Sequence, residues 1–430
     1  MKPHLLMVER APDAAWGVVT STRPIASLRV GVCTVTERIE RWSGSVCAGV
    51  LARGALEGFE EEGSGRTVIA PADAGAEGTL FWNSRAIPLL NTPPPPLGPR
   101  PGVIEVAGRY AGLWLPPGRR LPIAPGDLPD GRTSADAPAI RADDGEVPVA
   151  ALEGVWLDAP WSLIEHNPAL LAADLDAFHG LGPDGTPTHH RYEGHPSAWI
   201  ERGHPVWTHE DVDIGPGVIL DAREGAIRLD QGVRVSGPAR LSGPLHLGWD
   251  TWVLGGSVAR SSIGPVSKVH GEIADSILLG WANKAHDGHL GHALVGRWVN
   301  LGAGTTNSDL RNDYATVKVE LPDRRVDSGL VKLGCMIGDH VKTGIGTLIP
   351  SGATLGAGSQ IATGGLVAAR IPPFSWVTSR GIDAYRLDRF EDAMRAVMAR
   401  RYQLPSPGVI RILRRLHAEV HGAGGERETP

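Results

Sequence analysis

The chain has 430 residues, a formal net charge of −6 and no block of basic residues. This composition argues against nucleic acid or an anionic membrane surface as a partner. The length allows two or three domains, and 56 glycines with 35 prolines indicate a turn-rich fold. Three cysteines without paired spacing, Cys33, Cys47 and Cys335, exclude a disulfide framework and a cysteine zinc site. With no recognisable signal peptide or membrane span, we expect a soluble cytoplasmic protein.

Residues 1–205 mix short apolar runs with helical patterns. The runs expected to form buried strands are Leu5–Val8, Val18–Val19, Val30–Val35, Val68–Ile69 and Leu80–Trp82. Helices are expected over Glu37–Trp42 and Leu163–His179, the second capped by Ser162 with Glu165 completing a capping box. This mixture predicts an α/β domain over 1–205.

Apolar or small residues recur at every sixth position in the second half of the chain. The first row is Ile227, Val233, Ala239, Leu245, Thr251, Ser257, Ile263 and Val269; a second row is Leu229, Val235, Leu241, Leu247 and Val253; and the period resumes with Ile337, Thr343, Ile349, Leu355, Ile361 and Val367. A period of six fits neither a helix nor a meander of strands. It is typical of a solenoid with short strands on flat faces and tight turns at the corners. We therefore predict a parallel β-helix of hexapeptide repeats over 206–378.

The period lapses between Gly304 and Leu330. Insertions in solenoids form loops on one face, which is often the functional face. Beyond the repeats, residues 379–430 carry apolar residues at helical spacing, interrupted at Pro405 and Pro407. We expect a helical tail there, broken into two helices and packed against the end of the solenoid.

Titratable residues are densest just before the lapse in the repeat. Three histidines at spacing three, His286, His289 and His292, stand beside Lys284 and Asp287. Histidine is the natural general base near neutral pH, and a neighbouring aspartate can orient its ring. The same residues have two other interpretations. They can be structural histidines at a solvent-exposed corner, or they can bind zinc across a subunit boundary, although no cysteine supports them.

Amide and glycine residues follow this cluster. Asn300 and Asn307 can fix the hydroxyls or carbonyls of a substrate, and Gly302, Ala303 and Gly304 allow a ligand to approach the backbone closely. The candidates for substrate binding are Lys284, His289, His292, Asn300, Asn307 and Asn312. The catalytic candidate is His286.

The segment from His286 to Thr305 resembles the acyltransferase domain of bifunctional N-acetylglucosamine-1-phosphate uridylyltransferases. In that family a catalytic His precedes the Asn of a Val-Asn-Ile-Gly-Ala-Gly-Thr motif by fourteen positions, and His286 stands at that distance from Asn300. His289 takes the place of a substrate-contacting Tyr. The family's later Asn-Tyr-Asp element has no direct match, and Asp309-Leu310-Arg311 occupies its offset.

The whole chain resembles a divergent GlmU-like branch of sugar nucleotidyltransferases. The matching segments are Thr22-Arg23-Pro24, Leu28-Arg29-Val30-Gly31, Trp82-Asn83-Ser84-Arg85, Leu163-Ile164-Glu165-His166-Asn167, Trp281 to Gly288 and Asn307 to Asn312. The resemblance implies a nucleotidyltransferase-like (Rossmann-like) first domain, a left-handed β-helix, and a homotrimer with ligand sites between neighbouring solenoids. It further implies that His286 activates an amino sugar or sugar phosphate for attack on acyl-CoA, with acetyl-CoA as the expected donor. The backbone amides of 302–304 would hold the oxyanion.

Nucleotidyl transfer needs a glycine-rich loop for the phosphates, a cation, and an acidic residue for Mg²⁺. The first expected strand runs into Glu9–Ala15 without a Gly-x-Gly, which leaves this activity open. The candidates for nucleotide or phosphate binding are Arg23, Arg29, Asn83 and Arg85, and those for Mg²⁺ are Asp13 and Asp73. Surface ion pairing explains Arg23 and Arg29 equally well.

Three functions are compatible with these patterns. The first is a sugar-nucleotide transferase with a hexapeptide-repeat acyltransferase domain, acting on a sugar phosphate or nucleotide sugar. The second is a zinc-dependent, hydratase-like β-helix trimer. The third is a trimeric scaffold that binds sugar nucleotides without catalysis.

Overall fold

The computed structural model describes residues 4–9, 14–61, 68–69, 78–117, 128–133, 141–142, 145–182, 185–194 and 197–422. The chain forms two compact units. Unit 1 consists of Met1–Asp13, Arg23–Leu28 and Cys33–Ser162, and unit 2 of Ala14–Thr22, Arg29–Val32 and Leu163–Pro430. Two short stretches from the first tenth of the chain therefore belong to the unit that contains the solenoid.

Unit 1 is built on a seven-stranded mixed sheet in the order β12-β8-β9-β6-β1-β4-β5. Its strands are β1 (His4–Val8), β4 (Val46–Leu51), β5 (Val68–Ile69), β6 (Thr79–Asn83), β8 (Gly102–Val106), β9 (Arg109–Leu115) and β12 (Val149–Leu152). Strand β1 pairs in parallel with β4 on one side and β6 on the other. The strand order therefore reverses at β1, which is the arrangement in which open α/β sheets bind ligands at the carboxyl ends of the strands. The predicted α/β class is confirmed.

The helices of the first half differ in part from the prediction. Helix α2 (Val35–Ser43) begins with a capping box between Thr34 and Glu37, and α3 covers Pro160–Phe178. The capping box predicted at Ser162 is wrong, because α3 begins two residues earlier and the Ser162 hydroxyl accepts a hydrogen bond from the Ala159 amide. The strand predicted at 18–19 is also wrong. Those residues form a short helix, α1 (Gly17–Thr20). The remaining elements of the first half are η1 (Ile25–Ser27), β2 (Arg29–Val30), β3 (Cys33–Thr34), η2 (Gly54–Leu56), β7 (Ala86–Pro88), β10 (Arg141–Ala142), β11 (Gly145–Glu146) and β13 (Gly154–Trp156).

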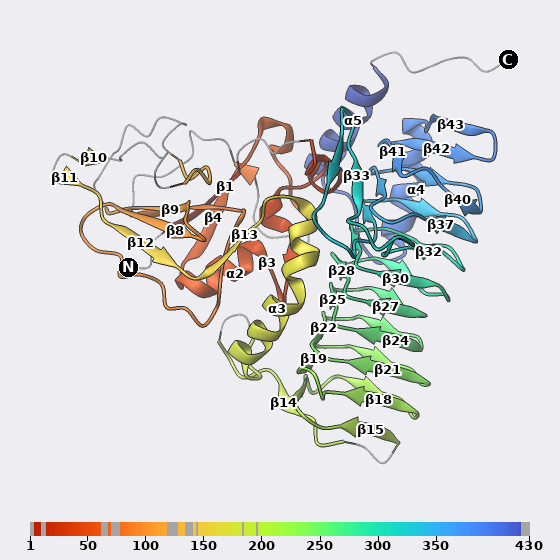
Figure 1. Cartoon of the computed structure of the whole chain (residues 1–430), viewed down its shortest axis with the longest axis horizontal. Helices are drawn as coiled ribbons and strands as arrows, with labels where there is room; N and C mark the ends of the chain where they lie inside the picture. Colours follow the sequence, from red (N-terminus) through yellow and green to blue (C-terminus); the bar gives the residue numbers. More distant parts are fainter. Residues whose placement is uncertain are drawn as a thin grey trace. The chain divides into compact units, whose positions relative to one another are not determined.

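Unit 2 contains a parallel β-solenoid with three faces, whose coils are stacked on one another (Figure 1). The first face holds β14 (His190–Arg191), β16 (Val206–Thr208), β19 (Ile227–Leu229), β22 (Leu245–Leu247), β25 (Ser262–Ile263), β28 (Ile277–Leu278), β31 (Leu294–Val295), β35 (Met336–Ile337), β38 (Thr354–Leu355) and β41 (Arg370–Ile371). The second face holds β17 (Asp213–Ile214), β20 (Arg234–Val235), β23 (Trp252–Val253), β26 (Lys268–Val269), β29 (Asn283–Lys284), β36 (Lys342–Thr343), β39 (Gln360–Ile361), β42 (Ser375–Thr378) and β43 (Gly381–Ala384). The third face holds β15 (Ala198–Glu201), β18 (Val218–Asp221), β21 (Ala239–Ser242), β24 (Gly256–Ala259), β27 (Glu272–Ala274), β30 (His289–Gly291), β32 (Thr306–Asn307), β37 (Thr347–Ile349) and β40 (Gly365–Leu366). From β16 to β42 the chain visits the faces in this order, and the predicted β-helix is confirmed. Strand β14, which precedes these coils, pairs antiparallel with β16.

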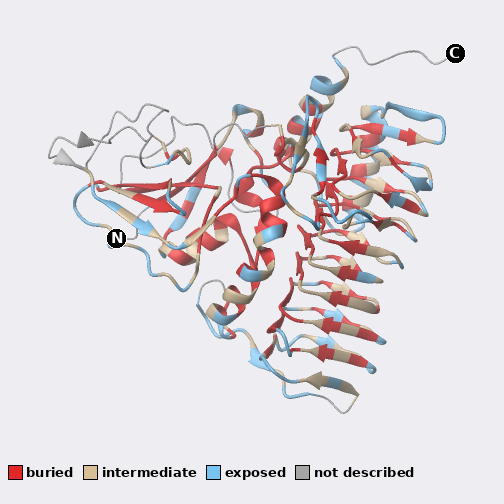
Figure 2. Ribbon diagram, in the orientation of Figure 1, coloured by how far each residue is buried: buried red, intermediate tan, exposed pale blue. Residues whose placement is uncertain are grey.

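The buried hydrophobic residues of the three faces form one apolar core. Figure 2 colours the buried positions along the coils red. The predicted rows lie in this core, with one slip at Ser257. Leu229 pairs with Leu247, eighteen residues on, but Leu247 pairs with Ile263 after only sixteen. On the third face between them, Leu241 pairs with Val258, seventeen residues on. The inward position there moves by one residue, so Val258 is buried instead of Ser257. Coils of fewer than eighteen residues therefore interrupt the sixfold period.

The lapse in the repeat is an insertion within one coil. Val295 pairs with Ile337, forty-two residues on, and the added chain includes the antiparallel hairpin β33 (Lys318–Glu320) and β34 (Arg325–Asp327). The insertion leaves and rejoins the solenoid next to β30, β32 and β37.

The tail forms two helices, α4 (Leu387–Ala399) and α5 (Pro407–His421). The prediction that it packs against the end of the solenoid needs correction. The Phe390 ring contacts His340 and Phe374, and Arg401 donates to the Val266 carbonyl at 2.9 Å. These partners come from corners between the first and second faces in several coils, so the helices run along the solenoid. The last edge of the second face is covered instead by β43. Among the described residues, no helix combines the length and apolarity needed to cross a membrane.

Candidate active site

The predicted catalytic histidine lies at a corner between the second and third faces. Strand β29 ends at Lys284 and β30 begins at His289, so residues 285–288 form the corner. The side chains of His286 and Asp287 are exposed there. Asp287 Oδ1 lies 3.3 Å from Nδ1 of His270, which occupies the same corner one coil earlier. The His286 imidazole has no hydrogen-bond or ion-pair partner among the described residues, and is therefore available to a ligand.

Lys284 points away from this exposed corner. Its side chain is buried, and Nζ donates to the carbonyls of His270 at 3.0 Å and His286 at 2.5 Å. Burial lowers the pKa of Lys284 to about 8, although Asp287 opposes the shift. The structure thus places the ammonium beneath the corner, in contact with the backbone.

His289 lies on the outer surface of the third face between two carboxylates. Its Nδ1 is 3.4 Å from Glu272 Oε1, and its Nε2 is 3.8 Å from Asp309 Oδ2. The neighbouring carboxylate of Asp309, assisted by that of Glu272, raises the pKa of His289 above its ordinary value, while desolvation opposes this. Asp309 also contacts His292, and the two imidazoles hold the pKa of this carboxyl well below its usual range. The arrangement favours a protonated His289.

His292 belongs to a longer ladder of charges across the coils. Asp275 Oδ2 is 3.9 Å from His292 Nε2 and also pairs with Arg260 through two contacts of 2.8 Å. Asp309 Oδ2 lies 2.7 Å from Nδ1 of His292 on the other side. The charge ladder, defined as Arg260, Asp275, His292, Asp309, His289 and Glu272, therefore fixes the position of the carboxylate that contacts His289.

The predicted glycine segment forms a tight turn one coil above the His286 corner. The Thr305 amide donates to the Gly302 carbonyl at 3.0 Å, and Gly304 has a φ of 72°. The Gly302 amide donates to the Thr343 carbonyl, and the Gly304 amide donates to the Asp287 carbonyl at 3.1 Å. The Ala303 amide has no acceptor among the described residues. Of the three predicted oxyanion donors, only Ala303 thus keeps its N–H for a ligand.

The three predicted asparagines have different surroundings. Asn300 lies on the second face, where its Oδ1 accepts from Asn283 Nδ2 at 2.6 Å. Asn307 is buried, with Oδ1 accepting from the Gly291 amide at 2.8 Å and Nδ2 donating to the Gly291 carbonyl at 2.9 Å. Asn307 therefore joins two coils. Asn312 is exposed and lies in the insertion.

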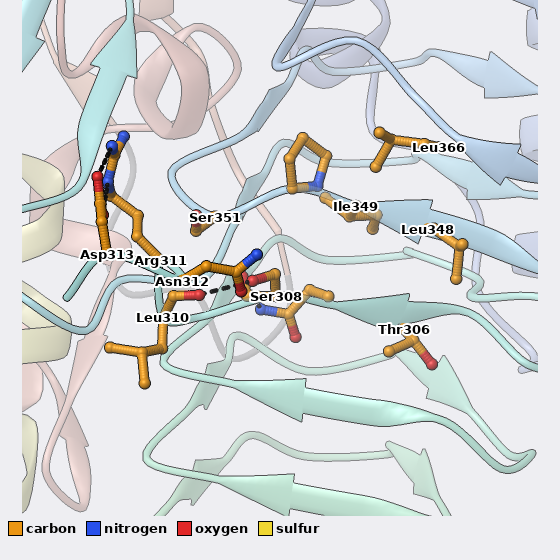
Figure 3. A pocket seen from close by; sticks show the side chains of 12 residues that line it. Thr306, Ser308, Leu310, Arg311, Asn312, Asp313, Leu348, Ile349, Ser351 and Leu366 are labelled. Atoms are coloured by element: carbon orange, nitrogen blue, oxygen red, sulfur yellow. Dashed lines mark hydrogen bonds and ion pairs between the residues drawn. The ribbon is translucent and has the colours of Figure 1, made fainter. Parts of the chain in front are cut away.

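A hollow of about 600 Å³ opens between the third face and the insertion (Figure 3). The residues lining it are Thr306, Asn307, Ser308, Leu310, Arg311, Asn312, Asp313, Leu348, Ile349, Pro350, Ser351 and Leu366. Thr306, Leu348 and Leu366 are aligned on neighbouring strands, and the two leucine side chains are 44% and 75% exposed. This apolar strip continues the outer surface that carries His289.

The nucleotide-binding residues predicted in the first half each contact the protein itself. Arg23 is buried, with Nη2 2.7 Å from Glu61 Oε2. Asn83 donates to the Pro129 carbonyl at 2.8 Å, and Arg85 donates to the Leu157 carbonyl at 2.6 Å. Arg29, in unit 2, donates to the Val32 carbonyl. Each is engaged with the protein's own backbone or carboxylates. Asp13 and Asp73 lie outside the described residues.

Other residues of the same matching segments anchor the chain to the solenoid within unit 2. Asn167 Oδ1 accepts from the Gly31 amide at 2.8 Å and from the Ser262 hydroxyl at 2.9 Å. Thr22 Oγ1 donates to Asp339 Oδ2 at 2.6 Å. These contacts give the matching segments a structural role that sequence inspection did not suggest.

Unit 1 carries two buried polar atoms at the carboxyl ends of adjacent strands. Glu9 follows β1 and Ser84 follows β6, and the Ser84 amide donates to the Val8 carbonyl at 2.9 Å. Glu9 Oε2 accepts from the Ile25 amide, whereas Glu9 Oε1 and Ser84 Oγ have no partner among the described residues. Burial raises the pKa of Glu9 to about 7. The pair lies where the strand order reverses.

Comparison with known proteins supports the predicted resemblance. No protein-family model matches the chain. The chain is 30% identical over 234 residues to a bifunctional sugar-1-phosphate nucleotidylyltransferase/acetyltransferase of Sulfurisphaera tokodaii. The matched region covers 54% of this chain and 51% of that protein. The chain is 27% identical over 194 residues to the bifunctional protein GlmU of Acaryochloris marina (40% and 39%), and 32% identical over 109 residues to that of Methanocaldococcus jannaschii (25% and 26%).

The chain resembles bifunctional GlmU proteins. It spans about half of the length of the Sulfurisphaera relative and less of the other two. A solved structure of a candidate acetyltransferase from Bacillus cereus matches 51% of this chain and 98% of that chain, at 16% identity and a TM-score of 0.23.

Sequence inspection of this GlmU-like chain missed the groups that surround the histidines. The sequence singled out Asp309 only because it stands at the position of the family's Asn-Tyr-Asp element. It did not single out Glu272 or His270, because these residues lie on other coils. These neighbours can be found only from the register in which the strands pair, which places Glu272 opposite His289. The described residues contain no group of three or more His, Cys, Asp or Glu side chains arranged to hold a metal. The three cysteines are buried, and none forms a disulfide among the described residues.

Proposed function

We propose that unit 2 transfers an acyl group from acyl-CoA, with acetyl-CoA as the expected donor, to an amino sugar or sugar phosphate, with His286 as the general base. The observation that carries this proposal is the pairing of two free groups on adjacent coils. The imidazole of His286 and the amide of Ala303 both lack protein partners among the described residues, and the Gly304 amide bonds to the Asp287 carbonyl between them. Neighbouring strands lie about 4.8 Å apart. One thioester can therefore contact both groups.

The reaction follows from this geometry. The amine or hydroxyl of the acceptor attacks the thioester carbonyl while His286 removes its proton. The oxygen gains negative charge in the tetrahedral intermediate, and the Ala303 N–H donates a hydrogen bond to it. When the intermediate collapses, the carbon–sulfur bond breaks and the proton on His286 neutralises the departing CoA thiolate.

Unit 1 is proposed to bind the nucleotide part of a nucleotide sugar at the carboxyl ends of β1 and β6. The sheet reverses its order there, and the unpartnered oxygens of Glu9 and Ser84 are suited to ribose or base donors. We derive no nucleotidyl-transfer step for this unit.

We also propose a homotrimer, with the acyltransfer sites between neighbouring solenoids. The exposed strip of Leu348 and Leu366 next to the hollow supports a contact of this kind, because contiguous exposed apolar surface commonly marks an interface. The small-molecule ligands are then held between two copies of the third face.

The test is CoA release from a panel of acyl-CoAs with amino-sugar phosphates and sugar 1-phosphates as acceptors. His286→Gln should lower kcat by about 100-fold or more. His204→Gln, at an exposed position in an early coil, is the matched control and should leave kcat unchanged. If wild-type protein releases no CoA with any pair, or His286→Gln retains full turnover, the acyltransferase proposal fails. Stoichiometric zinc by elemental analysis would favour the hydratase-like alternative. Thermal-shift binding of sugar nucleotides without turnover would favour the scaffold.

A further inference from the structure

Lys284 occupies a position that the fold reserves for apolar side chains. On the second face it pairs in parallel with Val269, and the preceding coils place Val235 and Val253 at the same inward position. The three valines belong to the solenoid core, and Lys284 is only 2% exposed. Burying an ammonium group there costs stability that a valine would not. Such departures from a repeat are expected at functional sites.

The ammonium bridges two successive corners. Nζ donates to the His270 carbonyl of one coil at 3.0 Å and to the His286 carbonyl of the next at 2.5 Å. A Cβ atom on Gly271 would stand 3.1 Å from Nζ, and Gly271 has a φ of 85°. The missing side chain thus leaves room for the ammonium. Lys284 is the cation that ties the backbone of His286 to the coil below it.

We propose that Lys284 is a positioning residue of the acyltransfer site, one that fixes the backbone on which His286 stands and, by its charge, disfavours a second positive charge on the imidazole. This inference rests on the function proposed above. The charged and titratable groups around the corner are Lys284 beneath it, Asp287 and His270 beside it, and Glu272 and His289 on the adjoining third face. The lowered pKa of Lys284, about 8, still leaves the ammonium mostly charged at neutral pH.

The test compares Lys284→Met with wild-type protein. Methionine fills the inward position without a charge, so the fold should persist, with a melting temperature equal to or above that of wild type. We expect kcat to fall about 10-fold or more while KM for both substrates changes by less than about 3-fold, because the base is misplaced and not the ligands. The acid limb of the kcat/KM profile should move to higher pH by about half a unit.

A matched control is Lys342→Met. Lys342 also donates to a backbone carbonyl, that of Trp298, and burial lowers its pKa to about 8. Its contact is at the corner between the first and second faces, so we expect no movement of the acid limb. A purely structural role for Lys284 would lower kcat without moving that limb.

An NMR titration of the His286 imidazole provides a readout without substrate. In Lys284→Met its midpoint should move to higher pH by about half a unit, and in Lys342→Met it should not. An unchanged midpoint in Lys284→Met, or unchanged kcat in a preparation whose His286→Gln variant is inactive, overturns the inference and leaves the acyltransferase proposal intact. If His286→Gln retains turnover, the proposed function fails, and the titration still decides whether Lys284 acts on the imidazole.

Discussion

His292 Nδ1 lies 2.7 Å from Asp309 Oδ2, and this contact joins the insertion to the solenoid at the corner that follows β30. The same carboxylate oxygen is 3.8 Å from His289 Nε2. One carboxylate thus serves two histidines that are three residues apart in the sequence. The insertion supplies the group that the repeat itself lacks at this point.

Asp309→Asn should reduce stability in a pH-dependent way. The pKa of His289 is raised, so its interaction with Asp309 stabilises the fold fully below about pH 6.5 and is lost as pH rises through the folded value. The pKa of Asp309 is lowered, so its contribution is present above about pH 4 and is lost on acidification. We expect the variant to be less stable by about 1 kcal/mol near pH 5.5 and by less near pH 8.5. Urea unfolding across this range measures the difference. Asp313 has no histidine partner in the part of the chain that the structure describes, so the stability loss of the control variant Asp313→Asn should not change with pH over this range. A stability loss in Asp309→Asn that is also independent of pH would contradict the coupling between Asp309 and His289.

Ala303→Pro should abolish acyl transfer without unfolding the turn. The Thr305 amide bonds to the Gly302 carbonyl, and Gly304 has a positive φ, so Ala303 stands where type II turns favour proline. The substitution removes only an N–H that has no acceptor among the described residues. We expect kcat to fall about 100-fold with the melting temperature retained, and Ala303→Ser to remain active. Steady-state kinetics with thermal unfolding tests this, and a fully active Ala303→Pro would exclude this amide as the oxyanion donor.

Asn167→Ala should destabilise unit 2 while leaving ligand binding unchanged. Its Oδ1 accepts from the Gly31 amide and from the Ser262 hydroxyl, all of them buried. Ser262 can still donate to the Gly31 carbonyl at 2.7 Å. The variant therefore leaves the buried Gly31 amide without an acceptor, which costs about 2 kcal/mol. Chemical denaturation checks the magnitude, with exposed Asn91→Ala as a neutral control. A loss of nucleotide affinity at full stability would instead indicate a binding role for this segment.

Asp230→Ala should weaken the first coils of the solenoid. Its carboxylate accepts from His189 at 3.0 Å, from Arg228 at 2.8 Å and from His246 at 2.8 Å, and all three partner side chains are nearly inaccessible. Removing it leaves a buried guanidinium without its counter-ion, so we expect a loss of about 3 kcal/mol. The amide hydrogens of β19 and β22 should also exchange faster in this variant. Asp211→Ala, at an exposed aspartate, should cost less than about 0.5 kcal/mol, and equal effects of the two variants would refute this account.

Leu348→Lys with Leu366→Lys should dissociate the proposed trimer. A lysine on each exposed leucine places like charges in an apolar contact, where they cannot be paired. Analytical ultracentrifugation should show smaller particles, and acyl transfer should fall with them because the sites lie between solenoids. Leu404→Lys, at a leucine that is 79% exposed in the tail, controls for added charge. Unchanged sedimentation of the double variant would place the interface elsewhere.

In the first half of the chain, local sequence patterns predict strands but not the contacts between distant residues. The apolar runs at 5–8, 68–69 and 80–82 form strands of one sheet, because a buried strand is recognisable from its own residues. The matching segments around Thr22 and Gly31 suggested phosphate binding through Arg23 and Arg29, and the segment around Asn167 carried only the family resemblance. Their roles depend on partners more than a hundred residues away, such as Asp339 and Ser262. No local pattern reports such partners.

The sequence by itself determined the three-faced solenoid, because an inward side chain repeats with the strand and corner geometry and needs no distant partner. It also located the histidine corner and the insertion, since both break that repeat. Only the tertiary structure decided which carboxylate meets His289, which amide of 302–304 stays free, and that Lys284 points inward. Those relationships lie between coils, and coils of fifteen to forty-two residues bring different residues opposite one another. A fixed period in the sequence cannot encode that changing register.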